Sequence, residues 1–173
     1  MDWDKEEETS KAVKCELKQL FHKEFNALLP VKTLSVSEVA LGSHMFVTVK
    51  HIATGAYDKT KARLVADGSQ QDASLYPDKS SPTLAMHSLY TVFAMYAGLS
   101  GFLMAKVDIK GAFVQTPMEG PNVYMHIHRK VVAYLLVLYP EFAEYVQADG
   151  SIITLLLNAM YGCVQASKLW YIT

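Results

Sequence analysis

The sequence predicts an α+β fold in which an antiparallel hairpin packs with helices. Apolar residues recur at helical spacing near the beginning of the chain and again at 131–139, whereas residues 45–66 alternate between apolar and polar with the period of a strand. The chain has 173 residues, of which 51% are hydrophobic and 19% are charged. These values are ordinary for a globular protein, so we expect one folded unit with a sizeable core.

Composition also sets expectations about the cellular setting. The sequence has no run of about 18 apolar residues and begins with an acidic segment, which predicts neither a transmembrane segment nor a signal peptide. Its two cysteines, Cys15 and Cys163, form no CxxC pair, which favours a reducing compartment. We therefore expect an intracellular protein, cytoplasmic or nuclear, with no membrane partner. The net charge of −1 means that a nucleic-acid-binding surface would have to be local.

The first thirty residues predict an amphipathic helix. We expect it over 5–28, with Asp4 as its N-cap and Pro30 after its end. We interpret residues 1–30 as this N-terminal helix and residues 31–173 as the domain that follows. The apolar face of the predicted helix consists of Val13, Leu17, Leu20, Phe21, Phe25 and Leu28.

A β-hairpin is predicted over 45–66. In its second strand Lys61 and Arg63 share one face, while Ala62, Leu64 and Ala66 line the other. From the pattern alone, paired cations on a strand are more often a solvated surface than a binding site.

The middle of the chain predicts a loop, a helix and a short strand. Residues 67–80 are polar and rich in turn formers, so we expect a loop. Ser81-Pro82-Thr83 predicts a helix start, and residues 81–100 carry no Asp, Glu, Lys or Arg, which predicts a buried helix. The apolar run 102–107 predicts a central strand that ends at Asp108.

The last third of the chain predicts alternating strands and helices. Strands are expected where Val123, Met125 and Ile127 alternate with polar residues and at 152–157. A helix is expected over 131–139, and a short helical turn follows at 141–147.

Two clusters of residues could carry chemistry. Asp108 at a strand end is either a cap of the following turn or a metal ligand, and two-metal phosphoryl transfer needs at least one more converging carboxylate, which the sequence does not point out. His126 and His128 lie on one strand face, a spacing that zinc can use, but no third ligand accompanies them, so an exposed strand face is the better interpretation.

Six segments in order resemble the motifs of copia-type LTR-retrotransposon reverse transcriptases. The resemblance covers roughly residues 44–173. It implies a truncated right-hand polymerase fold, with the fingers and the first part of the palm. The segments are KARLVA-x-G at 61–68, QQD at 70–72, SSPT at 80–83, VDIKGAF at 107–113, VYM at 123–125 and AMYGCVQASKLWY at 159–171.

The resemblance implies roles for particular residues. Asp108 matches the first catalytic aspartate, a ligand of two Mg²⁺ ions that activate the primer hydroxyl and neutralise the triphosphate. Phe113 matches the aromatic residue that packs under the incoming sugar, and Lys61 and Arg63 match the cations that meet the triphosphate. The implied nucleotide-binding residues are Lys61, Arg63, Phe113, Gly162 and Gln165.

Two departures from the family pattern limit the expected activity. Asp67 stands after the Leu-Val-Ala strand, where the family has a basic residue. The family's second and third catalytic aspartates lie downstream of the Trp-Tyr pair, which is Trp170 and Tyr171 here. We therefore expect these 173 residues alone to be inactive as an RNA-directed DNA polymerase. In the parent enzyme the partners would be an RNA or DNA template-primer, a deoxynucleoside triphosphate and the remainder of the Pol polyprotein. The alternative is a non-catalytic remnant that binds nucleic acid or protein.

Overall fold

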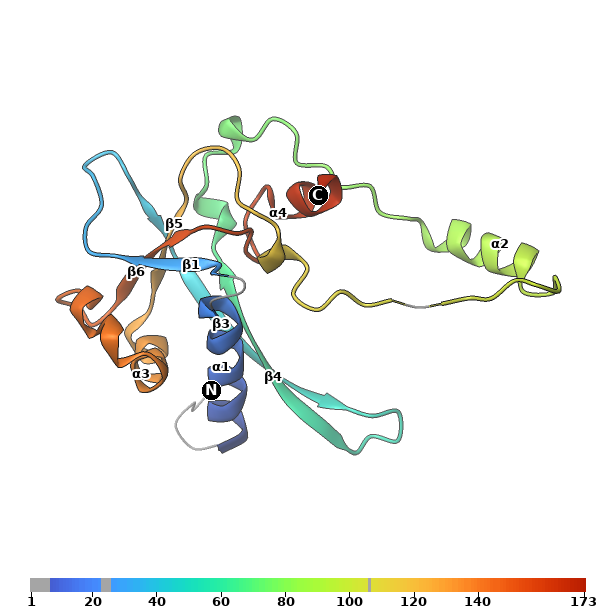
Figure 1. Ribbon diagram of the computed structural model, residues 1–173, viewed down its shortest axis with the longest axis horizontal. Helices are drawn as coiled ribbons and strands as arrows, with labels where there is room; N and C mark the ends of the chain where they lie inside the picture. Colours follow the sequence, from blue (N-terminus) through green and yellow to red (C-terminus); the bar gives the residue numbers. More distant parts are fainter. Residues whose placement is uncertain (1–6, 23–25, 106) are drawn as a thin grey trace.

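The computed structural model describes residues 7–22, 26–105 and 107–173, which form a mixed α+β fold with two small sheets (Figure 1). The α+β prediction is confirmed at this level. Besides four short 3₁₀ turns, the described residues form ten helices and strands. These are α1 (Glu7–Phe21), β1 (Leu28–Val31), β2 (Ala40–Leu41), β3 (Ser43–His51), β4 (Tyr57–Ala66), α2 (Met86–Tyr96), β5 (Tyr124–Ile127), α3 (Arg129–Leu138), β6 (Ile152–Leu156) and α4 (Ala166–Ile172).

The larger sheet has the strand order β1-β6-β5-β2. β6 pairs antiparallel with both β1 and β5, and the two-residue β2 pairs parallel with β5. Met125 and Ile127 of β5 are fully buried, as the alternation predicted. The predictions of strands at 123–127 and 152–157 and of a helix at 131–139 are confirmed within one or two residues at their ends.

The hairpin of β3 and β4 forms the second sheet. Arg63 lies opposite Phe46 and Lys61 lies opposite Thr48. Ala62, Leu64 and Ala66 are buried, while Lys61 and Arg63 are exposed, so the predicted assignment of the two faces is confirmed.

Helix α1 ends at Phe21, whereas the sequence pattern predicted a helix that continues to residue 28. The chain instead turns at Asn26, whose φ is +42°, and Leu28 begins β1 by pairing with Leu156 of β6. Pro30 is tolerated there because β1 is the edge strand of its sheet. Val13, Leu17, Leu20 and Phe21 are buried as predicted, and Asp4 and Phe25 lie outside the described residues.

Helix α1 shares one hydrophobic core with the sheet and the hairpin. Leu17 of α1, Leu64 of β4, Met125 of β5 and Leu135 of α3 belong to the same buried cluster. The helix therefore packs as part of the core rather than beside it.

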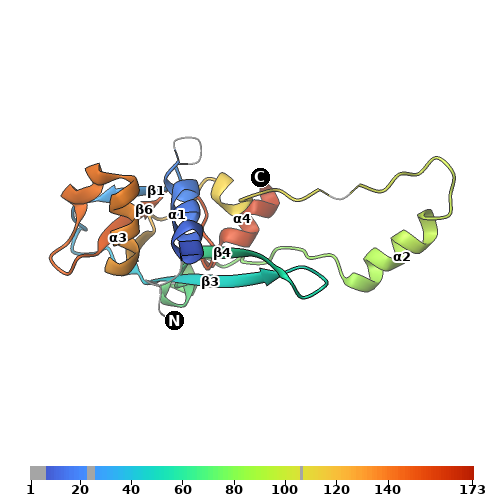
Figure 2. The same ribbon diagram turned by 90° about the horizontal axis from the view of Figure 1, so that it is seen from below.

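The prediction of a buried helix over 81–100 is wrong in both extent and environment. α2 begins at Met86, after Ala85, whose backbone is extended and which caps the helix without a side-chain hydrogen bond. None of its residues is buried, and Figures 1 and 2 both show it projecting away from the rest of the chain. Composition predicted an apolar environment, but none of the residues that the structure describes covers this helix.

The predicted strand over 102–107 is also wrong for the residues described there. Residues 102–105 and 107–109 form no regular secondary structure and pair with no strand of the described chain, so Asp108 lies in a loop. Among the helices of the described chain, none is long and apolar enough to cross a bilayer.

Candidate nucleotide-binding site

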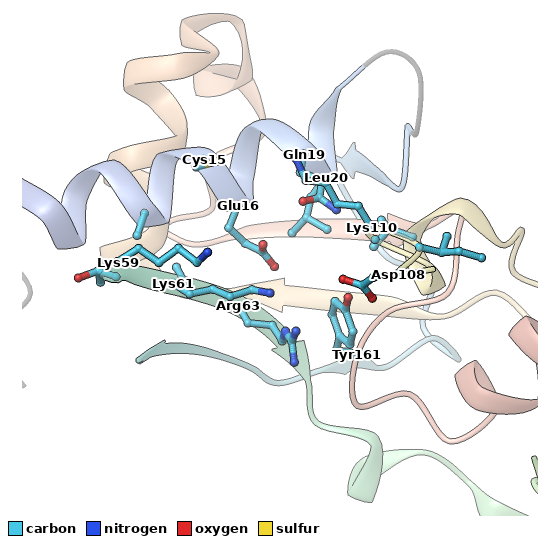
Figure 3. A pocket seen from close by; sticks show the side chains of 16 residues that line it. Cys15, Glu16, Gln19, Leu20, Lys59, Lys61, Arg63, Asp108, Lys110 and Tyr161 are labelled. Carbon is cyan, nitrogen blue, oxygen red and sulfur yellow. The ribbon is translucent and has the colours of Figure 1, made fainter. Parts of the chain in front are cut away.

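A cavity of about 500 Å³ lies between α1, β4 and the loop that carries Asp108 (Figure 3). Lys61 and Arg63 enter it from β4, and Asp108 enters it from the loop. Three of the residues singled out in the sequence thus line one cavity, although Asp108 lies 45 positions after Arg63 in the chain.

Two basic residues of this cavity, Lys61 and Arg63, make no ion pair within 4 Å among the described residues. Strand alternation places Lys61 and Arg63 together on the exposed face of β4. Within the described ranges the structure records an ion pair for neighbouring Lys59, with Asp58 at 3.5 Å, but none for Lys61 or Arg63. An arginine without a carboxylate partner can offer its planar fork of N–H donors to a phosphate group.

Tyr161 connects the cations to Phe113. The guanidinium carbon of Arg63 lies 4.4 Å from the centre of the Tyr161 ring, which is cation–π geometry. The ring of Phe113 meets the same tyrosine edge-on, with 5.2 Å between the ring centres. Phe113 therefore reaches the site through Tyr161 and does not itself line the cavity. Sequence reasoning gave Tyr161 no role, although it lies in a quoted motif.

Asp108 is held near α1 by a tight turn. Gly111 has a φ of +66°, and a Cβ there would overlap the side chain of Gln19 on α1. The glycine lets the loop approach the helix closely. Figure 3 shows the Asp108 carboxylate at one end of the cavity, with Lys59 at the other.

Gly162 and Gln165 lie outside the cavity and hold the last loop against the hairpin. The N–H of Ala66 donates to the carbonyl oxygen of Tyr161 at 2.8 Å, and Gly162 packs on the backbone of Ala66. The buried Gln165 accepts a hydrogen bond from Nε2 of Gln71 at 3.1 Å, and Oε1 of Gln71 accepts one from the N–H of Val164 at 2.8 Å. These contacts give both residues a structural role, and their nucleotide-binding roles stay predictions.

Glu16 of α1 is the site residue that sequence reasoning missed. Its carboxylate accepts a hydrogen bond from the N–H of Leu64 at 3.1 Å and lines the cavity beside the basic residues. Burial raises the pKa of Glu16, while the Leu64 N–H, Arg63 and Lys61 oppose that rise. An acid at position 16 falls on the apolar face defined by Val13, Leu17 and Leu20, and that position was the available signal.

The histidines proposed as an alternative metal site have protein partners. Nε2 of His126 lies 3.5 Å from Oδ2 of Asp149, and Nδ1 of His128 accepts the N–H of Lys130 at 3.3 Å, which caps α3. No group of three or more His, Cys, Asp or Glu side chains in the described chain could hold a metal ion.

The Mg²⁺ that the resemblance implies stays a prediction, and its one matched ligand in this chain is Asp108. Asp108 could supply one oxygen ligand next to bound phosphates, which is a common way for proteins to bind Mg²⁺. A pair of ions needs several converging carboxylates, and the described residues bring no such group together. Among the described residues, Asp108 is therefore the residue that would hold an ion, beside the phosphates of a bound nucleotide.

Comparisons of the chain with protein-family models, with characterised proteins and with solved structures gave no match.

The two cysteines are expected to differ sharply in reactivity. Burial raises the pKa of the Cys163 thiol to about 11, whereas Cys15 is exposed and lines the cavity. Iodoacetamide at neutral pH should therefore alkylate Cys15 and leave Cys163 intact in the folded protein, as read by peptide mass spectrometry. Equal labelling of both thiols would contradict the burial of Cys163, and labelling in denaturant provides the control.

Proposed function

We propose that this chain is the fingers and first palm portion of a copia-type reverse transcriptase, and that its cavity binds the triphosphate of a nucleotide. One observation carries the proposal. Lys61, Arg63 and Asp108, to which the resemblance gives neighbouring roles, line the same cavity from distant parts of the chain.

The chemistry of the cavity suits a triphosphate. Lys61 and Arg63 make no recorded ion pair in the described chain, so an incoming phosphate would not have to break one. Lys59 and Lys110 also line the cavity, which gives it four basic side chains against the acids Glu16 and Asp108. Such an excess of positive charge favours a polyanion over a neutral ligand.

Binding and catalysis separate in this proposal. In the full-length parent, Asp108 would share bound Mg²⁺ with further carboxylates and support RNA-directed DNA synthesis. These 173 residues contain one matched aspartate, so we expect nucleotide binding without polymerisation.

Two assays test the proposed function. Isothermal titration should detect binding of thymidine triphosphate with Mg²⁺ and no binding of thymidine at the same concentration. Primer extension on an RNA template should yield no product. Equal affinity for thymidine and its triphosphate would refute the phosphate site, and template-directed extension would refute the expected inactivity.

A second candidate, a remnant that binds single-stranded nucleic acid, is favoured by the outer face of the hairpin. A groove of about 370 Å³ runs there, and its lining includes Phe46, Lys50 and Arg63. Phe46 is 56% exposed, and its ring lies 6.2 Å from that of His44. Exposed aromatic rings between cations are the usual platform for stacked bases and their phosphates.

The nucleic-acid candidate predicts a specific loss on Phe46→Ala. Stacking of one base contributes about 1–3 kcal/mol, so affinity for a single-stranded oligonucleotide should fall roughly fivefold or more in a fluorescence anisotropy titration. Phe102→Ala removes a ring of equal exposure far from the hairpin and serves as the control. If both variants bind as the unmodified chain does, the candidate fails.

A further inference from the structure

Glu16 places a negative charge where the cavity otherwise attracts anions. Its carboxylate points from α1 into the cavity toward the basic side chains of β4 (Figure 3). Opposite charges interact strongly at such partly buried sites, because solvent screens them poorly.

The carboxylate is fixed in place by the backbone. The N–H of Leu64 donates to it at 3.1 Å, so Glu16 satisfies a backbone group of β4 at the side that faces α1. Two residues further along β4, the N–H of Ala66 donates to the backbone carbonyl oxygen of Tyr161. If the side chain left the cavity, the Leu64 N–H would lose this hydrogen-bond partner, which favours the position that Glu16 holds.

We infer that Glu16 is the internal counter-charge of the Lys61 and Arg63 pair, and that it lowers the affinity of the cavity for anions and couples their binding to proton uptake. The inference deepens the proposed function and rests on the cavity as an anion site. An anion placed near Glu16 repels its carboxylate, so the protonated form of Glu16 binds the anion more tightly than the ionised form.

Several other groups face Glu16 and must be considered in any pH dependence. Lys59, Lys61 and Arg63 face it from β4, and Asp108 and Lys110 face it from the loop. Cys15 on α1 and Tyr161 complete the set. A comparison of two proteins that differ only at position 16 retains all of these groups and the titration of the ligand, so their effects largely cancel in the ratio of the affinities.

The direction of the pH effect follows from the environment of Glu16. Its raised pKa means that Glu16 takes up a proton at a higher pH than an exposed glutamate does. At neutral pH the ionised carboxylate opposes the ligand, and this opposition fades as the pH falls through the range in which Glu16 becomes protonated. A glutamine at position 16 lacks the charge at every pH.

The test is the affinity of sodium tripolyphosphate for the full chain and for Glu16→Gln, measured by titration calorimetry between about pH 5 and pH 7.5. Glutamine is isosteric and keeps an oxygen to accept the Leu64 N–H, so the fold should survive, which thermal unfolding verifies. At neutral pH we expect Glu16→Gln to bind about fivefold more tightly, with the ratio falling toward one at the acid end. Glu7→Gln, which removes the same charge from an exposed position on α1, should change the affinity little.

Each outcome decides something. Equal affinities for the unmodified chain and Glu16→Gln would overturn the inference and leave the proposed phosphate site standing. Binding by Glu16→Gln alone would support the inference in its strongest form, with Glu16 blocking the site. No binding by either protein would overturn both the inference and the proposed site. A fivefold ratio that does not change with pH would overturn the coupling to protons.

Discussion

Gly162→Ala is expected to destabilise the protein by about 3 kcal/mol, more than any other single change considered. Gly162 has a φ of +92°, a backbone conformation that residues with a Cβ rarely adopt. A Cβ at this position would also overlap the carbonyl oxygen of Ala66 at the end of β4. Strain and overlap add, so the midpoint of thermal unfolding should fall by roughly 6–12 °C in a circular dichroism melt.

Gly55→Ala separates the two causes of this loss. Gly55 has a similar φ of +86°, but a Cβ there would meet nothing within 4 Å. It should therefore cost about 1 kcal/mol from backbone strain alone. If the two variants unfold at the same temperature, the close packing of the Tyr161–Gly162 loop against β4 is contradicted.

Lys61→Ala with Arg63→Ala is expected to weaken triphosphate binding at least roughly 100-fold. Each charge-assisted hydrogen bond to a phosphate contributes about 1.5–3 kcal/mol, and the double variant removes both donors from the cavity. Both side chains are exposed, but their loss also removes the positive charges beside Glu16 and the contact of Arg63 with Tyr161, so a modest fall in the melting temperature is expected and circular dichroism verifies that the variant is folded. Titration calorimetry with thymidine triphosphate and Mg²⁺ measures the effect.

The matched control for that variant is Arg129→Ala with Lys130→Ala. These two exposed residues begin α3 and contribute the same charge far from the cavity. A nonspecific loss of positive charge would weaken binding equally in both double variants, whereas a phosphate site on β4 requires a large difference between them.

Periodic burial explains which parts of the fold could be predicted from the sequence. The β3–β4 hairpin, β5, α3 and β6 each bury one face, so their apolar residues recur with the period of the element. The sequence also predicted that Lys61 and Arg63 share a face, since strand alternation alone determines it.

The errors arose where long-range contacts override local pattern. The predicted helix extended to Leu28, but pairing of Leu28 with Leu156 makes this residue the start of β1. The segment 81–100, which has no Asp, Glu, Lys or Arg, was predicted to be buried, yet none of the described residues covers α2. An apolar segment indicates that the segment would be stable in an apolar environment, but it does not show which other segment provides that environment.

The candidate site was predictable only in part. Motif order identified Asp108, Lys61 and Arg63, and the structure brings these three to one cavity. Glu16 and Tyr161 were not predicted as site residues, because their roles depend on contacts between distant parts of the chain. Glu16 contacts the Leu64 N–H, and Tyr161 contacts the Arg63 guanidinium. A helical wheel marks Glu16 as an acid among apolar neighbours, but it does not reveal which cations lie opposite.

The most direct test of triphosphate binding in this cavity uses Cys15, the exposed thiol that lines it. The rate at which iodoacetamide alkylates Cys15 should fall when thymidine triphosphate and Mg²⁺ are added, and should not change with thymidine. In the Lys61→Ala with Arg63→Ala variant the triphosphate should give no protection. An unchanged rate for the unmodified chain at a triphosphate concentration that saturates binding would place the ligand elsewhere and contradict the assignment of this cavity.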